Sequence, residues 1–210
     1  MNNTKYDNLL NLNVINKINA NSKVLDIGCW KGDLGKYLID NKNCSVDGID
    51  YHNDVLLRAK NNGYKNTFCI NLNCETKNLN DLNLKIYDYI VCADVLEHIV
   101  SAESVLKILQ KSIDDKTKLI ISIPNIAFLK YRILHLLGNF DYTKTGVMDE
   151  THVKFYTKKS ISKLLKDCGF KIEYFNGYTI AGRNFWFVDY LAKIWPSMFG
   201  LQFLIVCTKN

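Results

Sequence analysis

The stretch VLDIGCWKGDLG, Val24 to Gly35, joins an apolar run to the start of an amphipathic helical pattern. Gly28 and Gly32 lie in the turn between them, where a residue without a side chain lets the backbone turn tightly and approach a ligand closely. In open parallel sheets, ligands bind beyond the carboxyl ends of the strands. The stretch therefore predicts a strand–turn–helix unit with a ligand site at its turn.

Outward from this stretch, apolar runs that suit buried strands alternate with helical patterns, which predicts βαβ repetition and a mainly parallel sheet with helices on both faces. Strands are expected at 23–27, 45–49, 67–70, 87–93, 118–123, 170–175 and 201–208. Helices are expected at 33–40, 52–62, 101–112, 126–137, 158–168 and about 184–195. Ser101 and Thr157 have side chains that suit the N-cap positions of two of these helices.

The length of 210 residues predicts a single domain, 1–210, and the apolar fraction of 48% argues against disorder. Two segments, about 126–156 and 178–199, interrupt the βαβ rhythm and are expected as insertions on the acceptor side of the site. Residues 185–206 are apolar but contain Asp189, Lys193 and Pro196, so no stable membrane insertion is expected. The N-terminal residues show no secretion signal.

The seven cysteines are odd in number and show no CxxC pairing, which favours reduced thiols, a cytoplasmic location and no metal site. The formal net charge is +6. Residues 126–171 contain nine basic and four acidic side chains. Such an excess can raise the local concentration of an anionic partner, although lysines on a solvated helix face would produce the same count.

Three carboxylates around the glycine turn indicate the charge of the ligand. Asp26 precedes the turn, Asp33 begins the next helix, and Asp50 ends the second strand, where a carboxylate can accept hydrogen bonds from ribose hydroxyls. Negative charge at this helix start suits a cationic ligand better than a diphosphate. The pattern GxxxG also differs from the GxGxxG of dinucleotide sites, so S-adenosylmethionine fits and NAD fits poorly.

These motifs, in this order, resemble those of class I S-adenosylmethionine-dependent methyltransferases. VLDIGCWKG is similar to the glycine-rich first motif, GID (48–50) to the acidic motif of strand two, and YDYIVCADVLEHI (87–99) to the strand-four segment of small-molecule O-methyltransferases. The resemblance implies a Rossmann-like α/β fold with a seven-stranded, mostly parallel sheet and an antiparallel last strand. It also implies S-adenosyl-L-methionine as cofactor and S-adenosyl-L-homocysteine as product.

The resemblance further assigns roles to individual positions. Asp26, Gly28 and Gly32 line the methionine end, Asp50 holds the ribose, Tyr51 and Asn71 contact adenine, Asp94 and Val95 border the sulfonium, and Cys29 and Leu72 complete the cofactor set. Two positions depart from the family pattern. Trp30 replaces the middle glycine, which is expected to restrict the turn, and Asn71 replaces the usual aspartate, although an amide can still accept and donate hydrogen bonds.

The acceptor side is expected in DETHVKFYT, Asp149 to Thr157. If this segment is extended, His152, Lys154 and Tyr156 project to one side, while Val153 and Phe155 anchor the other. His152 and His98 are the candidate catalytic residues, and Lys154, Tyr156 and Arg132 are candidate substrate-binding residues. The alternatives are a solvated loop and, for His98, a role in orienting Glu97.

DETHVKFYT also resembles a segment of small bacterial methyltransferases from surface-polysaccharide clusters, including those that modify a capsule phosphoramidate, and from methionine-biosynthesis clusters. This resemblance implies O-methylation of a small anionic acceptor such as a sugar nucleotide, a sugar phosphate or a phosphoramidate. A non-catalytic cofactor-binding partner module remains open, and a nicotinamide-dependent oxidoreductase is a weaker alternative because YxxxK is missing. No nucleic-acid partner is expected. Residues 184–199 could form a dimer contact, a lid or a membrane-surface contact.

Overall fold

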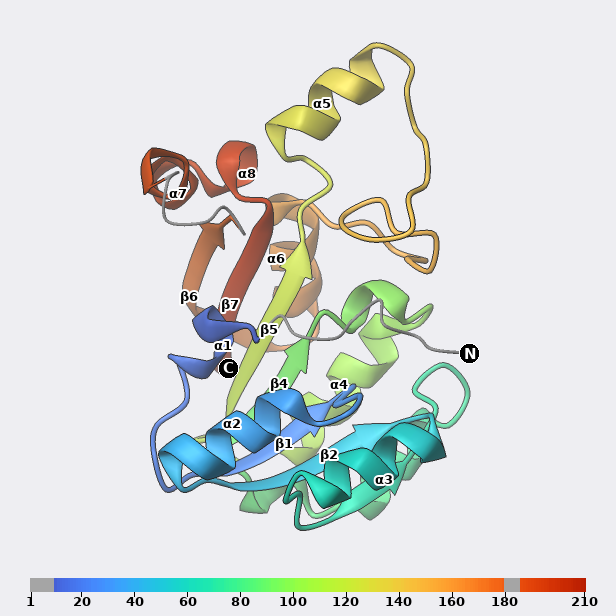
Figure 1. The fold of residues 1–210 in the computed structure, drawn as a ribbon, viewed down its shortest axis with the longest axis vertical. Coiled ribbons are helices and arrows are strands. Elements are labelled where there is room, and N and C mark those ends of the chain that lie inside the picture. The colour runs from blue at the N-terminus through green and yellow to red at the C-terminus, as the bar shows by residue number, and fades with distance from the viewer. Residues whose placement is uncertain (1–9, 180–185) are drawn as a thin grey trace.

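The computed structural model describes residues 10–179 and 186–210 and contains a seven-stranded sheet (Figure 1). Its strand order is β3-β2-β1-β4-β5-β7-β6. The strands are β1 (Lys23–Ile27), β2 (Ser45–Asp50), β3 (Thr67–Cys69), β4 (Tyr89–Ala93), β5 (Lys118–Pro124), β6 (Phe170–Tyr178) and β7 (Gln202–Lys209). Neighbouring strands from β3 to β5 pair in parallel, whereas β7 is antiparallel to both β5 and β6. The predicted Rossmann-like α/β fold with an antiparallel last strand is confirmed.

The helices cover both faces of this sheet. They are α1 (Leu12–Ile15), α2 (Asp33–Lys42), α3 (Asn53–Asn61), α4 (Ala102–Ser112), α5 (Leu129–Leu136), α6 (Lys158–Asp167), α7 (Trp186–Ile194) and α8 (Pro196–Phe199), with 3₁₀ turns η2 (Thr76–Asp81), η3 (Leu84–Ile86) and η4 (Leu96–His98). In Figure 1, α2 and α3 lie in front of the sheet, and α4 and α6 lie behind it. This two-sided cover explains why the central strands are apolar along their whole length.

Each face of the sheet has its own apolar core. One core contains the apolar stripe of α4, with Val105 and Leu109, together with Ile161 and Leu165 of α6. The other joins α1, α2 and α3 to the opposite face, with Leu38 of α2 among its fully buried side chains. Burial of the stripes at helical spacing stabilises these helices more than their intrinsic propensity does.

The two predicted N-caps differ in the structure. The Thr157 hydroxyl accepts a hydrogen bond from the backbone N–H of Ser160, and the Ser160 hydroxyl accepts one from the N–H of Thr157, which forms a capping box at α6. Ser101 precedes α4 as expected, but its side chain makes no capping hydrogen bond. The Thr157 side chain therefore satisfies a backbone donor at the start of α6, whereas the Ser101 side chain satisfies none at the start of α4.

The segment 126–156 stands beyond the carboxyl ends of β4 and β5 (Figure 1, yellow to orange). Its base is tied to the sheet, because Ile126 N–H donates to the Tyr156 carbonyl and Asn125 forms a bridge with Tyr156. Its helix α5 has no buried residue, and Leu136 is 86% exposed. The first predicted insertion therefore lies at the end of the sheet where ligands bind in this fold.

The second predicted insertion begins only after Tyr178, because β6 pairs with β7 over a longer stretch than its sequence pattern indicated. It contains α7 and α8. Its residues 180–185, which include the first two positions of the helix expected at about 184–195, lie outside the described part of the chain, as do residues 1–9, on which the expectation of no secretion signal depends. Within the described ranges, no helix is both long and apolar enough to span a membrane. All seven cysteines lie in the described ranges as free thiols, and five of them are buried.

Candidate functional site

The glycine turn after β1 adopts the left-handed backbone conformation that glycine allows. Gly28 has φ +72° and Gly32, the N-cap of α2, has φ +84°. The N–H groups of Gly28 and Cys29 both donate to the Ile49 carbonyl, at 2.8 and 3.0 Å, which ties the turn to the end of β2. A Cβ atom built on Gly28 would come within 2.5 Å of a methyl carbon of Val95. The turn after β1 therefore packs directly against the turn after β4.

Trp30 occupies the turn in an unexpected conformation. Its φ is +48°, so its backbone takes the left-handed region although its side chain disfavours that region. Trp30 thus takes the left-handed conformation despite its bulk, and the expectation that it restricts the turn stays a prediction. The Trp30 N–H donates to Asp50 Oδ2 at 3.0 Å, and this contact helps to hold the strained residue in place.

The carboxyl group of Asp26 is buried at the end of β1. The Tyr64 hydroxyl donates a hydrogen bond of 2.6 Å to Asp26 Oδ2. Burial raises the pKa of Asp26 to about 7; the bond from Tyr64 opposes this shift and the charge of Asp50 adds to it. Near neutral pH, Asp26 can therefore bind a cationic group or release a proton when such a group arrives.

Asp50 ends β2 with its carboxylate already in several hydrogen bonds. Oδ1 accepts from the backbone N–H of His52 at 3.0 Å and lies 3.2 Å from the His52 ring nitrogen Nδ1. A carboxylate oxygen has two lone pairs, so Asp50 can accept further bonds from a ligand hydroxyl. The geometry is that of a preorganised acceptor beside the glycine turn.

The remaining predicted cofactor residues lie at the ends of β2, β3 and β4. Tyr51 is 60% exposed, and its ring centroid lies 3.6 Å from that of His52. Asn71 Oδ1 accepts from the Asn73 N–H at 2.9 Å, so its amide nitrogen is the group available to donate to a ligand. Leu72 is in the apolar core. Asp94 has φ +55° and accepts a hydrogen bond of 3.0 Å from the Gln202 side chain.

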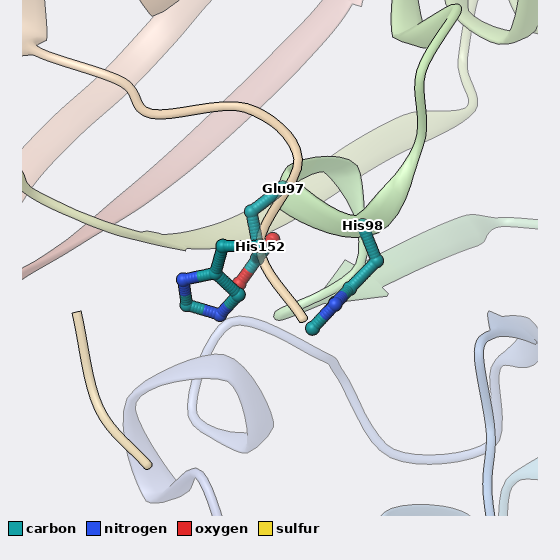
Figure 2. Close-up of side chains that lie close together, drawn as sticks. All are labelled: Glu97, His98 and His152. Carbon is teal, nitrogen blue, oxygen red and sulfur yellow. The ribbon is translucent and has the colours of Figure 1, made fainter. Parts of the chain in front are cut away.

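On the predicted acceptor side, the structure brings His98 and His152 together. Their ring centroids are 4.8 Å apart and the ring planes meet at 70°. Glu97 lies beside them (Figure 2) and has no solvent exposure. Burial, together with the charge of Asp94, raises the pKa of Glu97 well above its usual range. Glu97 and His98 directly follow the turn in which Val95 lies against Gly28, so the three residues and the glycine turn share one end of the sheet.

Comparison with known proteins agrees with this arrangement. The profile of the methyltransferase-domain family matches residues 3–174. The chain belongs to the methyltransferase-domain family. A ubiquinone biosynthesis O-methyltransferase of Coxiella burnetii is 29% identical over 129 residues, which are 61% of this chain and 54% of that protein. The chain thus spans about half the length of the curated relatives it matches.

Solved methyltransferase structures share the fold of this methyltransferase domain. A SAM-dependent methyltransferase from Methanosarcina mazei superposes with a TM-score of 0.67 at 19% identity, covering 96% of this chain and 98% of that one. One from Archaeoglobus fulgidus gives a TM-score of 0.64 at 18% identity, covering 94% and 90%. The family and the fold imply S-adenosylmethionine as cofactor.

The residues at the glycine turn fit this cofactor. A buried carboxyl group with a pKa of about 7 (Asp26) suits an ammonium group, and the preorganised carboxylate of Asp50 suits a diol. The tight contact between Gly28 and Val95 brings the turn to the start of the acceptor region. Bound there, S-adenosylmethionine supplies a methyl group activated on a sulfonium.

The segment 151–156 of the methyltransferase domain does not alternate as an isolated strand would. Val153 is 52% exposed, so the expectation that it anchors the segment is wrong, while Tyr156 is buried in the core. The reason is the pairing of this segment with η4: the N–H groups of both Val153 and Lys154 donate to the Glu97 carbonyl. Two successive donors on one acceptor break the alternation of a regular strand. The Lys154 side chain is exposed.

The positive charge of residues 126–171 divides between two places. Five of the nine basic residues belong to α6 and the start of β6: Lys158, Lys159, Lys163, Lys166 and Lys171. The other four, Lys130, Arg132, Lys144 and Lys154, belong to the segment 126–156. The Arg132 guanidinium donates to the carbonyls of Ala127, at 2.5 Å, and Ser197, at 3.4 Å, and thereby joins α5 to α8. Its predicted role in substrate binding stays a prediction.

Sequence reasoning gave no role of their own to two residues that the structure places in the site. Tyr64 reaches Asp26 from beyond α3, and no local pattern marks this contact. Glu97 was considered only as a residue that His98 might orient, because the letters LEHI do not show that its carboxylate is buried next to His152. The expectation of no metal site rests on the cysteines, whereas the potential ligands that the structure brings together are Glu97, His98 and His152.

Proposed function

We propose that this chain transfers the methyl group of S-adenosylmethionine to a hydroxyl oxygen of a small anionic acceptor. One observation carries the proposal: His98, three residues after the Val95 that packs against Gly28, meets His152, with ring centroids 4.8 Å apart. Groups that can take a proton from an acceptor therefore adjoin the turn expected to hold the methyl donor. Positioning of the two reactants is the main task of the protein in such a displacement.

His152 is the residue we assign to the acceptor oxygen. Its Nδ1 lies 3.0 Å from the Val147 carbonyl, which can only accept a hydrogen bond, so this nitrogen carries the proton in the neutral ring. Nε2 then holds the lone pair that can accept the acceptor's proton. The assignment of His98 follows the same logic, because its Nδ1 lies 3.2 Å from the Thr151 carbonyl.

The anionic character of the acceptor is supported by the basic side chains around this segment. Lys154 directly follows the His152–Val153 pair, and its side chain is exposed. Lys130 and Lys144 belong to the same protruding segment, 126–156. A sugar nucleotide, a sugar phosphate or a phosphoramidate from a surface-polysaccharide precursor would present the complementary charge.

One observation favours a second acceptor class, a phenolic ring. The ring centroid of Phe155 lies 6.3 Å from that of His152. It also lies 6.0 Å from the centroid of Phe140 and 6.2 Å from that of Tyr142. Phe140 and Tyr142 are exposed and could stack on a flat acceptor. The Coxiella burnetii relative, whose name places it in ubiquinone biosynthesis, agrees with this class.

The test is a transfer assay with radiolabelled S-adenosylmethionine and three acceptor sets: nucleotide-linked sugars, phosphorylated sugars and phenols. The active set identifies the acceptor class, and absence of label in every set contradicts the proposal. His152→Ala should lower turnover at least a hundredfold and leave S-adenosylhomocysteine binding unchanged. His135→Ala, on α5, is the matched control and should retain activity. Full turnover by His152→Ala would remove His152 from the mechanism.

A further inference from the structure

Three potential metal ligands converge at the start of the acceptor region. Glu97, His98 and His152 each offer one ligand atom, and these atoms all lie within 4.8 Å of one another. Figure 2 shows their side chains meeting from two separate segments, η4 and the loop that precedes α6. Folding alone brings these segments together.

The Glu97 carboxylate lacks the partners that a buried acid requires. Its side chain is 0% exposed, and among residues 10–179 and 186–210 neither carboxylate oxygen accepts a hydrogen bond. Burial of a carboxylate without a partner is strongly unfavourable, and buried charges in proteins are paired or coordinate metals. A cation between Glu97 and the two imidazoles would satisfy these oxygens.

Both imidazoles are oriented as metal ligands are. The Nδ1 atoms of His98 and His152 lie 3.2 and 3.0 Å from the carbonyls of Thr151 and Val147. A ring nitrogen that donates to a backbone carbonyl fixes the tautomer and leaves Nε2 as the basic atom, which is the usual arrangement behind a metal-bound histidine. Each ring therefore has its own backbone carbonyl that fixes its tautomer.

The backbone around the cluster is held in place before any ion arrives. Val153 and Lys154 both donate to the Glu97 carbonyl, which joins the His152 segment to η4. The buried Asp149 accepts from the N–H and the hydroxyl of Thr151, at 2.9 and 2.7 Å, and so fixes the loop that precedes His152. A preorganised ligand set lowers the ordering cost of binding.

We propose that Glu97, His98 and His152 bind one divalent transition-metal ion. One carboxylate and two imidazoles suit Zn²⁺, Mn²⁺, Fe²⁺ or Co²⁺ better than Mg²⁺, which prefers oxygen ligands. Ligand atoms bound to one ion at about 2.1 Å are separated by roughly 3.0–3.5 Å. In this structure the ligand atoms are up to 4.8 Å apart, so the side chains must move inward by about an ångström to bind one ion. The two partly exposed histidines can do this by rotation.

The binding site does not depend on the methyl-transfer reaction, but its catalytic use rests on the proposed function. An ion held here would polarise the acceptor hydroxyl and lower its pKa. With Nε2 of both histidines bound to the ion, neither ring can take the hydroxyl proton, so in the metal-bound enzyme this proton would pass to water instead of to His152. The oxygen would then form a bond to the methyl carbon, and the bond from that carbon to sulfur would break to leave S-adenosylhomocysteine. Three protein ligands leave positions open for such an acceptor.

The test is metal binding to chelator-treated protein, followed by calorimetry and by the visible absorption of Co²⁺. Wild type should bind one equivalent of Co²⁺, with an absorption band that Zn²⁺ removes by competition. Glu97→Gln keeps the shape of the side chain and should weaken binding at least tenfold, as should His152→Ala. His135→Ala should bind as wild type does. S-adenosylhomocysteine binding, measured on every variant, verifies that each one is folded.

Absence of saturable Co²⁺ and Zn²⁺ binding, or equal binding by wild type and Glu97→Gln, would overturn the site. Activity separates the two proposals. If the protein binds one ion but methylates no acceptor set, the proposed function fails and the metal site stands. If chelated protein methylates an acceptor at the full wild-type rate, the catalytic use of the ion fails and the proposed function stands.

Discussion

The phenol of Tyr64 donates a 2.6 Å hydrogen bond to the carboxyl group of Asp26, and both side chains are buried beneath the glycine turn. The neutral phenol is the only form that can donate, and burial together with the charge of Asp26 raises the pKa of Tyr64 well above its usual range. The pair therefore keeps one proton on Tyr64 throughout the neutral range and leaves Asp26 to titrate. This relationship makes ligand binding at the turn sensitive to pH.

Affinity for S-adenosylhomocysteine should rise as pH increases from 6 to 8. The pKa of Asp26 is about 7, so the anion that attracts the ligand's ammonium group is the minor form at pH 6 and the major form at pH 8. If only the anion binds well, affinity should increase about tenfold over this range. Calorimetry at several pH values measures the effect. Asp26→Asn keeps a bond acceptor for Tyr64 and should bind weakly with little pH dependence; an unchanged slope in this variant would contradict the assignment.

The same group predicts the pH dependence of stability without ligand. The folded pKa of Asp26, about 7, exceeds its unfolded value of 3.8, so the native state holds this proton more tightly than the unfolded state does between these values. The free energy of unfolding should therefore fall as pH rises from about 4 to 7, by an amount on the order of a few kcal/mol. Urea unfolding of wild type and Asp26→Asn should diverge over this window, with the variant relatively more stable at pH 7. Parallel curves would show that Asp26 is not the group responsible.

Asp50 should be required for the ribose end of the cofactor. Its carboxylate accepts from the N–H groups of Trp30 and His52, so removal also frees part of the turn. Asp50→Ala should weaken S-adenosylhomocysteine binding by tenfold or more, about 1.4 kcal/mol per factor of ten. Asp54→Ala removes an exposed carboxylate of α3 from the same neighbourhood and should bind normally. Equal affinity of the two variants for S-adenosylhomocysteine would contradict the assignment of Asp50 to the ribose.

The strands, the helices and the mainly parallel sheet could be predicted because strand runs and helical stripes alternate with different periods along the chain. The ends of elements were less predictable, since they depend on partners distant in sequence. The strand expected from residue 87 begins at Tyr89. The Asp88 backbone still bonds to Lys23 and Lys118, the first residues of β1 and β5, but the Tyr87 carbonyl accepts from a side chain, Thr117 Oγ1. β6 extends to Tyr178 because β7 supplies pairing across an irregularity near Ile172.

The position of the glycine turn at the strand ends could be predicted from sequence because its residues lie in short motifs there, as Asp26, Gly28 and Asp50 do. The acceptor side could be predicted only in part. His98 and His152 were each identified, but their approach to 4.8 Å depends on how segment 126–156 folds back onto η4. The burial of Glu97 is likewise a property of the assembled fold, so its chemistry could not be derived from the letters around it.

The caps of α6 and α4 should differ in energy although both residues suit the N-cap position. Thr157 forms a capping box with Ser160, so Thr157→Ala should cost about 1 kcal/mol of unfolding free energy. Ser101 makes no capping bond, so Ser101→Ala should change stability by less than about 0.5 kcal/mol. Urea unfolding measures both variants. A larger loss in Ser101→Ala than in Thr157→Ala would contradict the assignment of the caps.

Gly28 should tolerate a methyl group less well than another glycine with a similar backbone. At Gly28 an added Cβ would lie 2.5 Å from a Val95 methyl carbon, whereas at Gly138, with φ +82°, nothing lies within 4 Å. Gly138→Ala should therefore lower the free energy of unfolding only by the cost of the left-handed backbone, about 1–2 kcal/mol. Gly28→Ala should lower it by about 1–3 kcal/mol more, because of the clash. Chemical unfolding of both variants separates strain from clash. The double variant Gly28→Ala, Val95→Ala should recover part of the additional loss and reduce the gap to Gly138→Ala, because the shorter side chain removes the clashing methyl. If it recovers none, the close approach of the two turns is not what makes Gly28 necessary.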